Sequence, residues 1–363
     1  FDSIVKSPVR MISARFLTLC LFGGIFLYFP FCGNLNFIDA LFLAFSGVCV
    51  TGLATVSIDT SLTTFGQLVL LLLIQMGGLS IMSISSIIFL ILGKKMSLTY
   101  EKHARNMFSA DSKEEIKKLL FLIFKYTFIC EFVGFLILFI NLFMSNKDFI
   151  YSLKNGLFLS ISAFCNAGFT LFSDNLISLN NNSIILLTIS LLIILGGIAP
   201  IIVLTFPKIF KREKLDPMSL IVLNSTIILL LLGAIIFFIS EYSHLISSMN
   251  LLDKIANSWF QSVTTRTAGF NSLDLNNMKN VTYSLFLFLM VIGGSPGGMA
   301  GGIKTTTFSI ILITAYNTFF GKKNIVRNRE IDFEIVYKAI TMVLLYLSIV
   351  IVSNTLGALT NTF

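Results

Sequence analysis

Three short segments of the sequence share a pattern of small or polar residues around one central glycine. Glycine adopts positive φ angles at little cost, so it allows consecutive backbone carbonyl oxygens to point to one side. A ring of such oxygens can replace the water around a cation of suitable size. We therefore predict a cation-binding filter made by the backbone of these segments, which are Val50, Thr51, Gly52 and Leu53; Asn166, Ala167, Gly168 and Phe169; and Thr267, Ala268, Gly269 and Phe270.

The surroundings of the three segments also match. Each follows a moderately apolar stretch too short to cross a membrane: Phe37–Ser46, Ile150–Ser162 and Leu251–Ser262. Each is followed a few positions later by an acidic residue: Asp59, Asp174 and Asp274. Short helices that end at the filter would direct the negative ends of their dipoles toward it. The dipoles, the carbonyl oxygens and the acidic residues all favour a cation over an anion.

A pair of glycines recurs downstream of each segment. The pairs Gly77-Gly78, Gly196-Gly197 and Gly293-Gly294 lie 25, 28 and 24 residues beyond the three central glycines. Each glycine costs about 1 kcal/mol relative to alanine inside a helix. One pair would fit a close helix contact. Three pairs in register with three glycine segments indicate an internal repeat.

The third pair begins a longer interruption in the apolar stretch Thr282–Phe320. Six glycines and a proline within ten residues cannot continue a helix. Two interpretations stay open, a movable barrier to ions below the filter and a fixed kink. The predicted gate consists of Gly293, Gly294, Ser295, Pro296, Gly297, Gly298, Met299, Ala300, Gly301, Gly302 and Lys304. An intramembrane lysine is costly, and Lys304 either acts on the pathway or anchors the segment through carbonyl oxygens.

Long apolar runs must position these segments. The 363 residues are 55% hydrophobic and 12% charged, with a mean hydropathy of +0.89, whereas soluble domains carry about 25% charged residues. A helix needs about 20 apolar residues to cross a bilayer. Runs of this kind occur at Arg15–Phe31, Leu68–Leu92, Leu119–Phe143, Ser183–Phe206, Ser219–Ser240 and Val336–Leu359. The sequence therefore predicts an all-α membrane protein, built from repeated helix, re-entrant pore loop and helix units around one central pore.

The charge distribution predicts the orientation. The net charge of +8 comes from basic clusters between the predicted spans, whereas 32–67 contains no lysine or arginine. Because basic loops stay in the cytoplasm, we expect the N-terminus inside and the three glycine segments entering from outside. Clusters of this kind between spans indicate contact with a lipid bilayer, and no nucleic-acid partner is expected.

The repeat divides the chain into four predicted units. Residues 1–95 form the first, 96–214 the second, and 215–330 the third with its glycine-rich intramembrane segment. Residues 331–363 contain only the first helix of a fourth unit, which is incomplete. The central glycines are 116 and 101 residues apart, which places a fourth near residues 370–385, beyond Phe363. We therefore expect the natural chain to continue.

Two charged residues have predicted structural roles. Arg266 lies three residues before Gly269, where the other segments have Cys49 and Cys165. A bare cation facing the pathway would repel cations, so we expect Arg266 to support its loop from behind. Glu131 lies inside a predicted span, and we expect it to pair with a neighbouring helix.

These motifs resemble the Trk/Ktr/HKT superfamily of K+ transporters, and the Ktr-type membrane subunit in particular. The resemblance covers essentially the whole chain. Its most specific parts are Ser162–Phe169, Ser262–Asn271 and Gly293–Thr307. The resemblance implies a K+-channel-like fold, filter glycines at Gly52, Gly168 and Gly269, K+ bound by filter carbonyl oxygens, and K+ uptake across a bacterial plasma membrane.

The resemblance also implies partners. Ktr-type subunits pair as homodimers and bind a soluble cytoplasmic ring of nucleotide-binding regulatory subunits. K+ is the transported ion, Na+ is a candidate activator, and no cofactor is expected in this chain. A glycine at all three filter positions goes with K+ preference, whereas some plant relatives with a serine in the first loop prefer Na+.

A Na+-selective member of the superfamily and a secondary carrier for another solute both remain alternatives. Carriers commonly have two inverted halves, whereas here three units face the same way. Neither an HExxH nor a CxxC motif occurs among the predicted spans. An enzyme is therefore not expected.

Overall fold

The computed structural model describes residues 8–79, 113–203, 205, 217–323, 325–326 and 329–360. Over these residues the protein is helical, apart from a short hairpin of β1 (Ile325–Val326) and β2 (Arg329–Glu330). The predicted all-α class is confirmed. Several predicted features fall wholly or partly outside the described residues, including the basic clusters at 94–118 and 208–214 and the unit boundaries at residues 95 and 214.

The first unit begins with α2 (Pro8–Tyr28), which packs against the short helix α3 (Phe37–Val48). The chain then passes through the first glycine segment and α4 (Ile58–Ser61) into α5 (Thr64–Gly78). The Thr63 hydroxyl caps α5 by accepting a hydrogen bond from the Gly66 amide at 3.2 Å, which satisfies one of the free donors of the first turn.

The second unit has the same order of elements. The long helix α8 (Lys113–Asn146) packs against the short helix α9 (Phe149–Phe164), and the chain continues through η1 (Ile177–Leu179) to α10 (Ser183–Gly197) and α11 (Pro200–Val203). The Asp148 side chain caps α9 by accepting from the Tyr151 amide at 3.1 Å.

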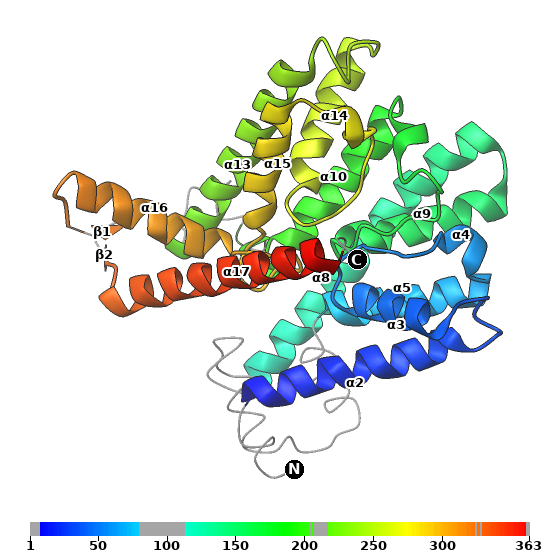
Figure 1. Ribbon diagram of the computed structural model, residues 1–363, viewed down its shortest axis with the longest axis horizontal. Coiled ribbons are helices and arrows are strands. Elements are labelled where there is room, and N and C mark those ends of the chain that lie inside the picture. The colour runs from blue at the N-terminus through cyan, green and yellow to red at the C-terminus, as the bar shows by residue number, and fades with distance from the viewer. Residues whose placement is uncertain are drawn as a thin grey trace.

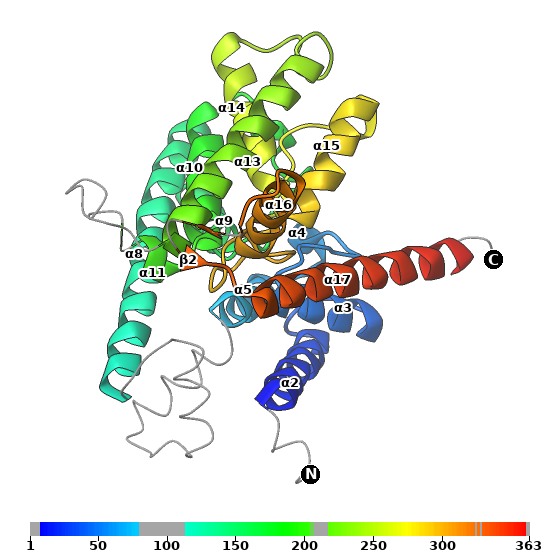
Figure 2. The same cartoon turned by 90° about the vertical axis from the view of Figure 1, so that its left-hand side faces the viewer.

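The third unit repeats the order a third time. It consists of α13 (Pro217–Glu241), the short helix α14 (Leu251–Thr264), η2 (Leu275–Asn277), and two half-length helices, α15 (Asn280–Val291) and α16 (Thr305–Phe319). The glycine-rich segment separates α15 from α16. The β1–β2 hairpin then leads to α17 (Phe333–Thr360), which packs along α16 and otherwise stands apart from the bundle (Figures 1 and 2).

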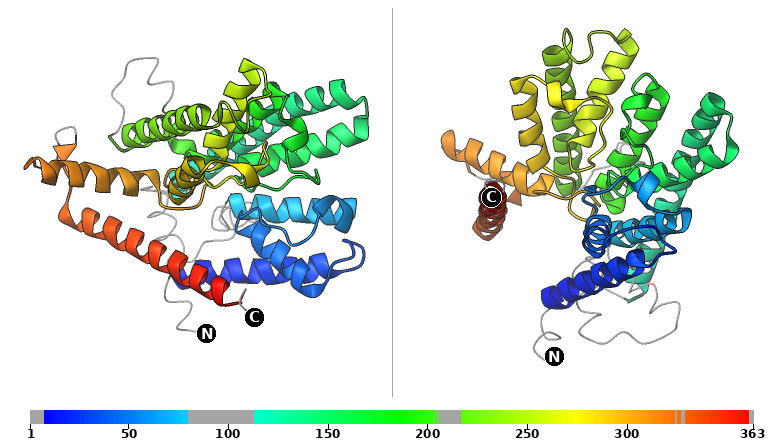
Figure 3. Two further views of the ribbon diagram at one scale, coloured as in Figure 1. Left: turned by 45° about the horizontal axis from the view of Figure 1, so that its top comes forward. Right: turned by 45° about the vertical axis from the view of Figure 1, so that its right-hand side comes forward.

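The units are arranged around a common centre. In each, the long first helix packs on its own short helix, as in α2 with α3, α8 with α9 and α13 with α14. The later helix of one unit then packs on the short helix of the next, as in α5 with α9 and α10 with α14. The contacts therefore run from one unit to the next, and Figure 3 shows the three units, coloured from blue through green to yellow, side by side.

Among the described residues, three helices have the length and apolar character to cross a membrane: Lys117–Asn146, Pro217–Glu241 and Phe333–Ala358. The predicted span Ser183–Phe206 is wrong as one continuous helix. It breaks between Gly197 and Pro200, because proline has no amide hydrogen to donate and its ring clashes with the preceding turn. The break leaves carbonyl oxygens near the end of α10 free for other donors.

Candidate ion pathway

The three glycine loops have the same backbone conformation. We call them loop 1 (Val50–Leu53), loop 2 (Asn166–Phe169) and loop 3 (Thr267–Phe270). The central glycines have φ angles of 81°, 74° and 84° in order. The first residue of each loop is also left-handed, at 55°, 59° and 72°. Non-glycine residues rarely adopt positive φ, so its recurrence at one repeat position indicates a shared fold of the loops.

The loops meet at the centre of the molecule. A methyl group added to Gly52 would overlap the Ala167 carbonyl oxygen, and one added to Gly168 would overlap that of Ala268. A methyl group on Gly269 would lie 3.8 Å from the Thr51 oxygen. Each glycine therefore faces the carbonyl that precedes the glycine of another loop. The order runs from loop 1 to loop 2 to loop 3 and back to loop 1.

A hydroxyl group near the end of each short helix fastens its loop. Leu53 donates its amide to Ser46 Oγ at 2.9 Å, Phe169 donates to Ser162 Oγ at 3.0 Å, and Phe270 donates to Thr264 Oγ1 at 2.8 Å. In loops 2 and 3 the hydroxyl also donates back to the carbonyl oxygen of the same phenylalanine, at 2.8 Å in both. Such paired bonds hold the residue after the glycine in a fixed position.

The side chains of the predicted filter residues lie in different surroundings. Leu53 is 60% exposed, whereas Phe169 and Phe270 are buried. Asn166 is buried and donates its side-chain amide to the Phe164 and Ile193 carbonyls, both at 3.3 Å. The Asn166 side chain is thus held by the helices behind loop 2, which leaves its backbone to contribute to the pathway.

Loop 3 is one residue longer than the others when counted from the end of its short helix. Gly52 and Gly168 follow the last helical residues, Val48 and Phe164, by four positions, but Gly269 follows Thr264 by five. The residues that cap the short helices are therefore Cys49, Cys165 and Thr265. The sequence equivalence of Arg266 with Cys49 and Cys165 holds only when counted back from the glycine.

The glycine-rich segment, Gly293–Gly302, is a loop between α15 and α16 whose two ends lie side by side. Its two ends pair through the amide of Gly293, which donates to Ile303 O at 2.9 Å, and that of Ile303, which donates to Val291 O at 3.0 Å. A side chain on Gly293 would overlap the Gly301 carbonyl oxygen. Glycine is required there because the two ends of the loop lie against each other.

The glycine-rich segment is bonded to the break at the end of α10. Ser295 and Met299 donate their amides to Gly197 O at 3.0 Å and Gly196 O at 2.9 Å. Ser295 Oγ accepts from the Ala199 amide at 2.6 Å. The carbonyl oxygens released by the Pro200 break are thus satisfied by the third unit, which joins the second glycine pair to the third.

The same segment is bonded to the base of loop 3. The Gly301 amide donates to Thr267 Oγ1 at 3.0 Å, and Arg266 Nη2 donates to the Gly293 carbonyl. Lys304 Nζ donates to the Ala300 carbonyl at 2.7 Å, which is the contact that the anchoring interpretation of Lys304 requires. Loop 3 and the glycine-rich segment therefore form one hydrogen-bonded body.

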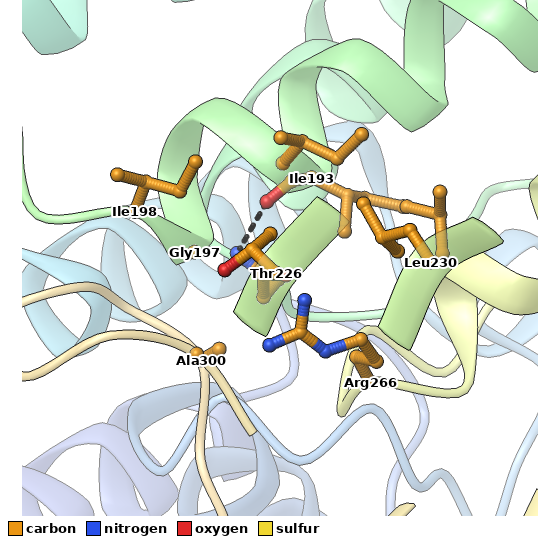
Figure 4. Close-up of a pocket in the computed structure, with 11 residues that line it drawn as sticks. Ile193, Gly197, Ile198, Thr226, Leu230, Arg266 and Ala300 are labelled. Atoms are coloured by element: carbon orange, nitrogen blue, oxygen red, sulfur yellow. Dashed lines mark hydrogen bonds between the residues drawn. The ribbon is translucent and has the colours of Figure 1, made fainter. Parts of the chain in front are cut away.

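Arg266 extends into a small cavity between the second and third units (Figure 4). Asn166, Gly197, Thr226 and Ala300 are among its lining residues, none of which is acidic. Arg266 is 7% exposed, and its Nε has no hydrogen-bond partner among the described residues. This placement is the one expected of a side chain that supports loop 3 from behind.

The acidic residues beyond the loops form local turns. Asp174 accepts from the Ser178 amide at 2.8 Å, and Asp274 caps η2 by accepting from the Asn276 amide at 3.1 Å. Asp59 lies in the first turn of α4. Asp174 and Asp274 therefore have structural roles that account for their residue types.

Sequence reasoning missed two groups of residues. The loop-fastening hydroxyls of Ser46, Ser162 and Thr264 could have been found, since a hydroxyl residue precedes each central glycine by five or six positions. Gln75 carried no such signal. It contacts both Glu131 and Cys165, which lie 56 and 90 positions away in the chain.

The chain contains three units, and each consists of a long helix, a short helix, a loop and a further helix. The three loops converge, and this architecture is that of a pore-loop membrane transport protein. The family model of TrkH, described as a cation transport protein, matches residues 25–361. The chain belongs to this family, which confirms the resemblance identified in the sequence and places the protein among cation transport proteins rather than in a family of enzymes.

Individual relatives of the chain support the same family assignment. The potassium/sodium uptake protein NtpJ of Enterococcus hirae is 34% identical over 362 residues, covering 98% of this chain and 80% of the relative. The Ktr system potassium uptake protein B of Bacillus subtilis is 35% identical over 354 residues, covering 94% and 78%. The crystal structure of the potassium transporter TrkH from Vibrio parahaemolyticus matches with a TM-score of 0.64 at 18% identity. This match covers 89% of the chain but 63% of that structure, so the chain spans less than two thirds of its length, and the likeness is one of fold.

Proposed function

We propose that this protein carries K+ across a bacterial plasma membrane, through a pathway lined by the backbone carbonyl oxygens of loops 1, 2 and 3. The observation that carries the proposal is the convergence of Gly52, Gly168 and Gly269, each left-handed and each facing a carbonyl or backbone atom of a neighbouring loop. Carbonyl rings of this kind replace the hydration shell of a cation.

Two observations support K+ as the transported ion. Glycine at every central position leaves room for carbonyl coordination without a side chain. The relatives described above include a Ktr system potassium uptake protein and a potassium transporter. A second candidate is Na+, either as the transported ion or as an activator, because another relative is named a potassium/sodium uptake protein.

The glycine-rich segment is the proposed gate. Its hydrogen bonds to the end of α10 and to the base of loop 3 support this role, because they connect the segment directly to one of the three loops. Deleting Gly294–Ala300 in the full-length protein should increase K+ flux. Gated flux that stays unchanged after the deletion would support a fixed kink instead.

We propose the cellular setting from the charge distribution and the family. The basic clusters support a cytoplasmic N-terminus. We expect the protein to form homodimers and to bind a soluble nucleotide-binding regulatory ring at its cytoplasmic face. The relatives named as Ktr system proteins B and D are components of a system by name, which supports an assembly with other subunits.

The proposal is tested by growth at limiting K+ in a bacterium that lacks its own K+ uptake. The full-length protein should restore growth, and Gly269→Asp should abolish it at equal membrane expression. Rescue by both proteins would leave transport standing and refute the role of loop 3. Rescue by neither, with the regulatory subunit present, would contradict K+ transport.

A further inference from the structure

Glu131 is a buried carboxyl group in the middle of a membrane-spanning helix. It lies on α8 within the apolar span Lys117–Asn146, and it is 5% exposed. Ionisable residues at such depth are rare, and they face protein or a wet cavity when they occur. The pathway described above makes no use of this side chain.

The contacts of Glu131 leave half of its carboxyl group unsatisfied. Gln75 Nε2, from α5, donates to Oε2 at 3.2 Å. Oε1 has no hydrogen-bond partner among the described residues. The Ser160 hydroxyl of α9 donates to the backbone carbonyl of Glu131 at 2.5 Å, which fixes this turn of α8 against the short helix.

Among the residues that the structure describes, none forms an ion pair with Glu131. Over their described lengths, α5, α10 and α11 carry no titratable side chain. On α9, Lys154 lies six residues before Ser160, about 9 Å along the helix axis. On α8, Lys125 lies six residues, likewise about 9 Å, from Glu131.

Three weakly acidic groups lie closer to Glu131 than these two lysines do, two of them along α8 and one through the contact with Gln75. Tyr126 donates its hydroxyl to the Leu195 carbonyl at 2.9 Å. Cys130 is the neighbouring residue, and Cys165 lies beyond Gln75. None of these groups supplies a positive charge. A buried carboxylate without a cation is costly, whereas a bound proton removes the charge.

Gln75 connects Glu131 to loop 2. Its Oε1 accepts from the Cys165 thiol at 3.5 Å, and Cys165 immediately precedes Asn166 of loop 2. A methyl group on Gly78 would lie 2.7 Å from Cys165 Sγ and 3.4 Å from Met299 Sδ. Cys165 is therefore next to both loop 2 and the tip of the glycine-rich segment.

We propose that Glu131 is a proton-binding site inside the membrane, and that its proton controls loop 2 through Gln75 and Cys165. We assign the hydrogen bonds of the structure, in which Cys165 donates to Gln75 Oε1 and Gln75 Nε2 donates to Glu131 Oε2, to the charged form. When a proton from water binds the carboxylate, the Gln75 amide turns over. The new O–H of Glu131 then donates to Gln75 Oε1, and Gln75 Nε2 donates to Cys165 Sγ.

The proton reaches Glu131 past Gln75. Gln75 is partly exposed, whereas Glu131 is buried. Turning the amide breaks no covalent bond and needs no other reactant. The link to the base of loop 2 reverses its direction, so proton occupancy changes how firmly that loop is held. This inference deepens the proposed K+ transport by naming the proton as a second ligand.

The test measures 86Rb+ flux across liposomes containing the full-length protein over a range of pH. Flux should change by up to about tenfold per pH unit around one midpoint, as expected for a single proton. Glu131→Gln mimics the protonated form, so its flux should stay at the acid plateau at every pH. The matched control Glu334→Gln, on an exposed turn of α17, should keep the wild-type profile.

Infrared difference spectroscopy tests the proton itself. A carbonyl band of a protonated carboxylic acid should appear on acidification of the wild type and be lost in Glu131→Gln. In Gln75→Leu the band should titrate at higher pH, because a donor to the carboxylate is gone, while flux loses its pH dependence. If Glu131→Gln fails to insert, this shift in Gln75→Leu decides the question.

Two results would overturn the proton site. One is a wild-type pH profile in Glu131→Gln, and the other is a band that does not move in Gln75→Leu. Rb+ flux that persists with an unchanged profile would leave the proposed K+ transport intact. Loss of all flux by the wild type would instead count against the transport proposal.

Discussion

Loops 2 and 3 have the same backbone but are held by different neighbours. Both have a left-handed first residue and a left-handed glycine, and both are fastened by a hydroxyl of their own short helix. Loop 2 is connected through Cys165 to Gln75 of the first unit. Loop 3 is connected through Arg266 and Thr267 to the glycine-rich segment of its own unit.

The backbone shape of these loops and their connections to other units depend on different residues. Their shape depends on glycine and on a local hydroxyl, both of which recur in the sequence. The longer side chain that bonds at the base of each loop differs, since it is Gln75 for loop 2 and Arg266 for loop 3. A repeated fold can thus give equivalent contributions to a pathway while only one loop is bonded directly to the proposed gate.

The largest expected effect comes from adding a methyl group to the central glycine of loop 2. Gly168→Ala should abolish Rb+ flux, because the methyl would overlap the Ala268 carbonyl at a φ of 74°. Gly269→Ala meets its nearest atom at 3.7 Å, so backbone strain of about 1–3 kcal/mol should reduce flux without abolishing it. Gly357→Ala, where a methyl meets nothing within 4 Å, is the control. Equal flux in all three variants would contradict the convergence of the loops.

The next largest effect on flux is expected from a variant that breaks the connection of loop 3 and leaves that of loop 2 intact. Arg266→Gln removes a charged donor to the Gly293 carbonyl, a bond worth about 1.5–3 kcal/mol. The glycine-rich segment should be held less firmly against loop 3, so flux without the regulatory subunit should rise about tenfold or more. Gln75→Leu, which acts on loop 2, should not raise this basal flux. A rise of equal size in both variants would show that the loops share one connection.

A smaller effect tests the loop-fastening hydroxyls. Ser162→Ala leaves the buried Phe169 amide and carbonyl without their partner, and we expect a loss of about 1–3 kcal/mol in the free energy of unfolding. Ser46→Ala should cost less, because Leu53 is 60% exposed and water can replace the hydroxyl. Thermal unfolding of the purified variants measures the difference. A larger loss in Ser46→Ala would contradict this ranking.

The smallest effect is expected far from both loops. Lys338 and Glu334 form an exposed pair on α17, with Nζ and Oε1 2.6 Å apart. Exposed pairs contribute little to stability, so Lys338→Ala should leave both flux and the unfolding temperature unchanged. A clear change in flux would place a functional contact on this face of α17.

Much of this arrangement could be predicted because it depends on local sequence. The glycines at 52, 168 and 269 recur with the short helices before them, and their backbone requirement does not depend on distant residues. The glycine pairs were also visible, and the interruption after α15 was predicted from its glycines and proline.

The rest depends on contacts between residues that are far apart in the chain. Ser295 and Gly197 are 98 positions apart, and Cys165 and Gln75 are 90 apart. Nothing in local spacing shows that the break before Pro200 releases carbonyl oxygens that bind the glycine-rich segment. The partner of Glu131 was unspecified for the same reason, since only packing of α5 against the second unit brings Gln75 to it.

The most direct test of the central claim is to locate the ion. Crystals of the full-length protein grown in Rb+ should show anomalous scattering between the carbonyl oxygens of Thr51, Ala167 and Ala268, and the peak should disappear in Gly168→Ala. A well-ordered structure with these three carbonyls in place and no Rb+ between them, or with Rb+ bound elsewhere, would contradict the proposed pathway.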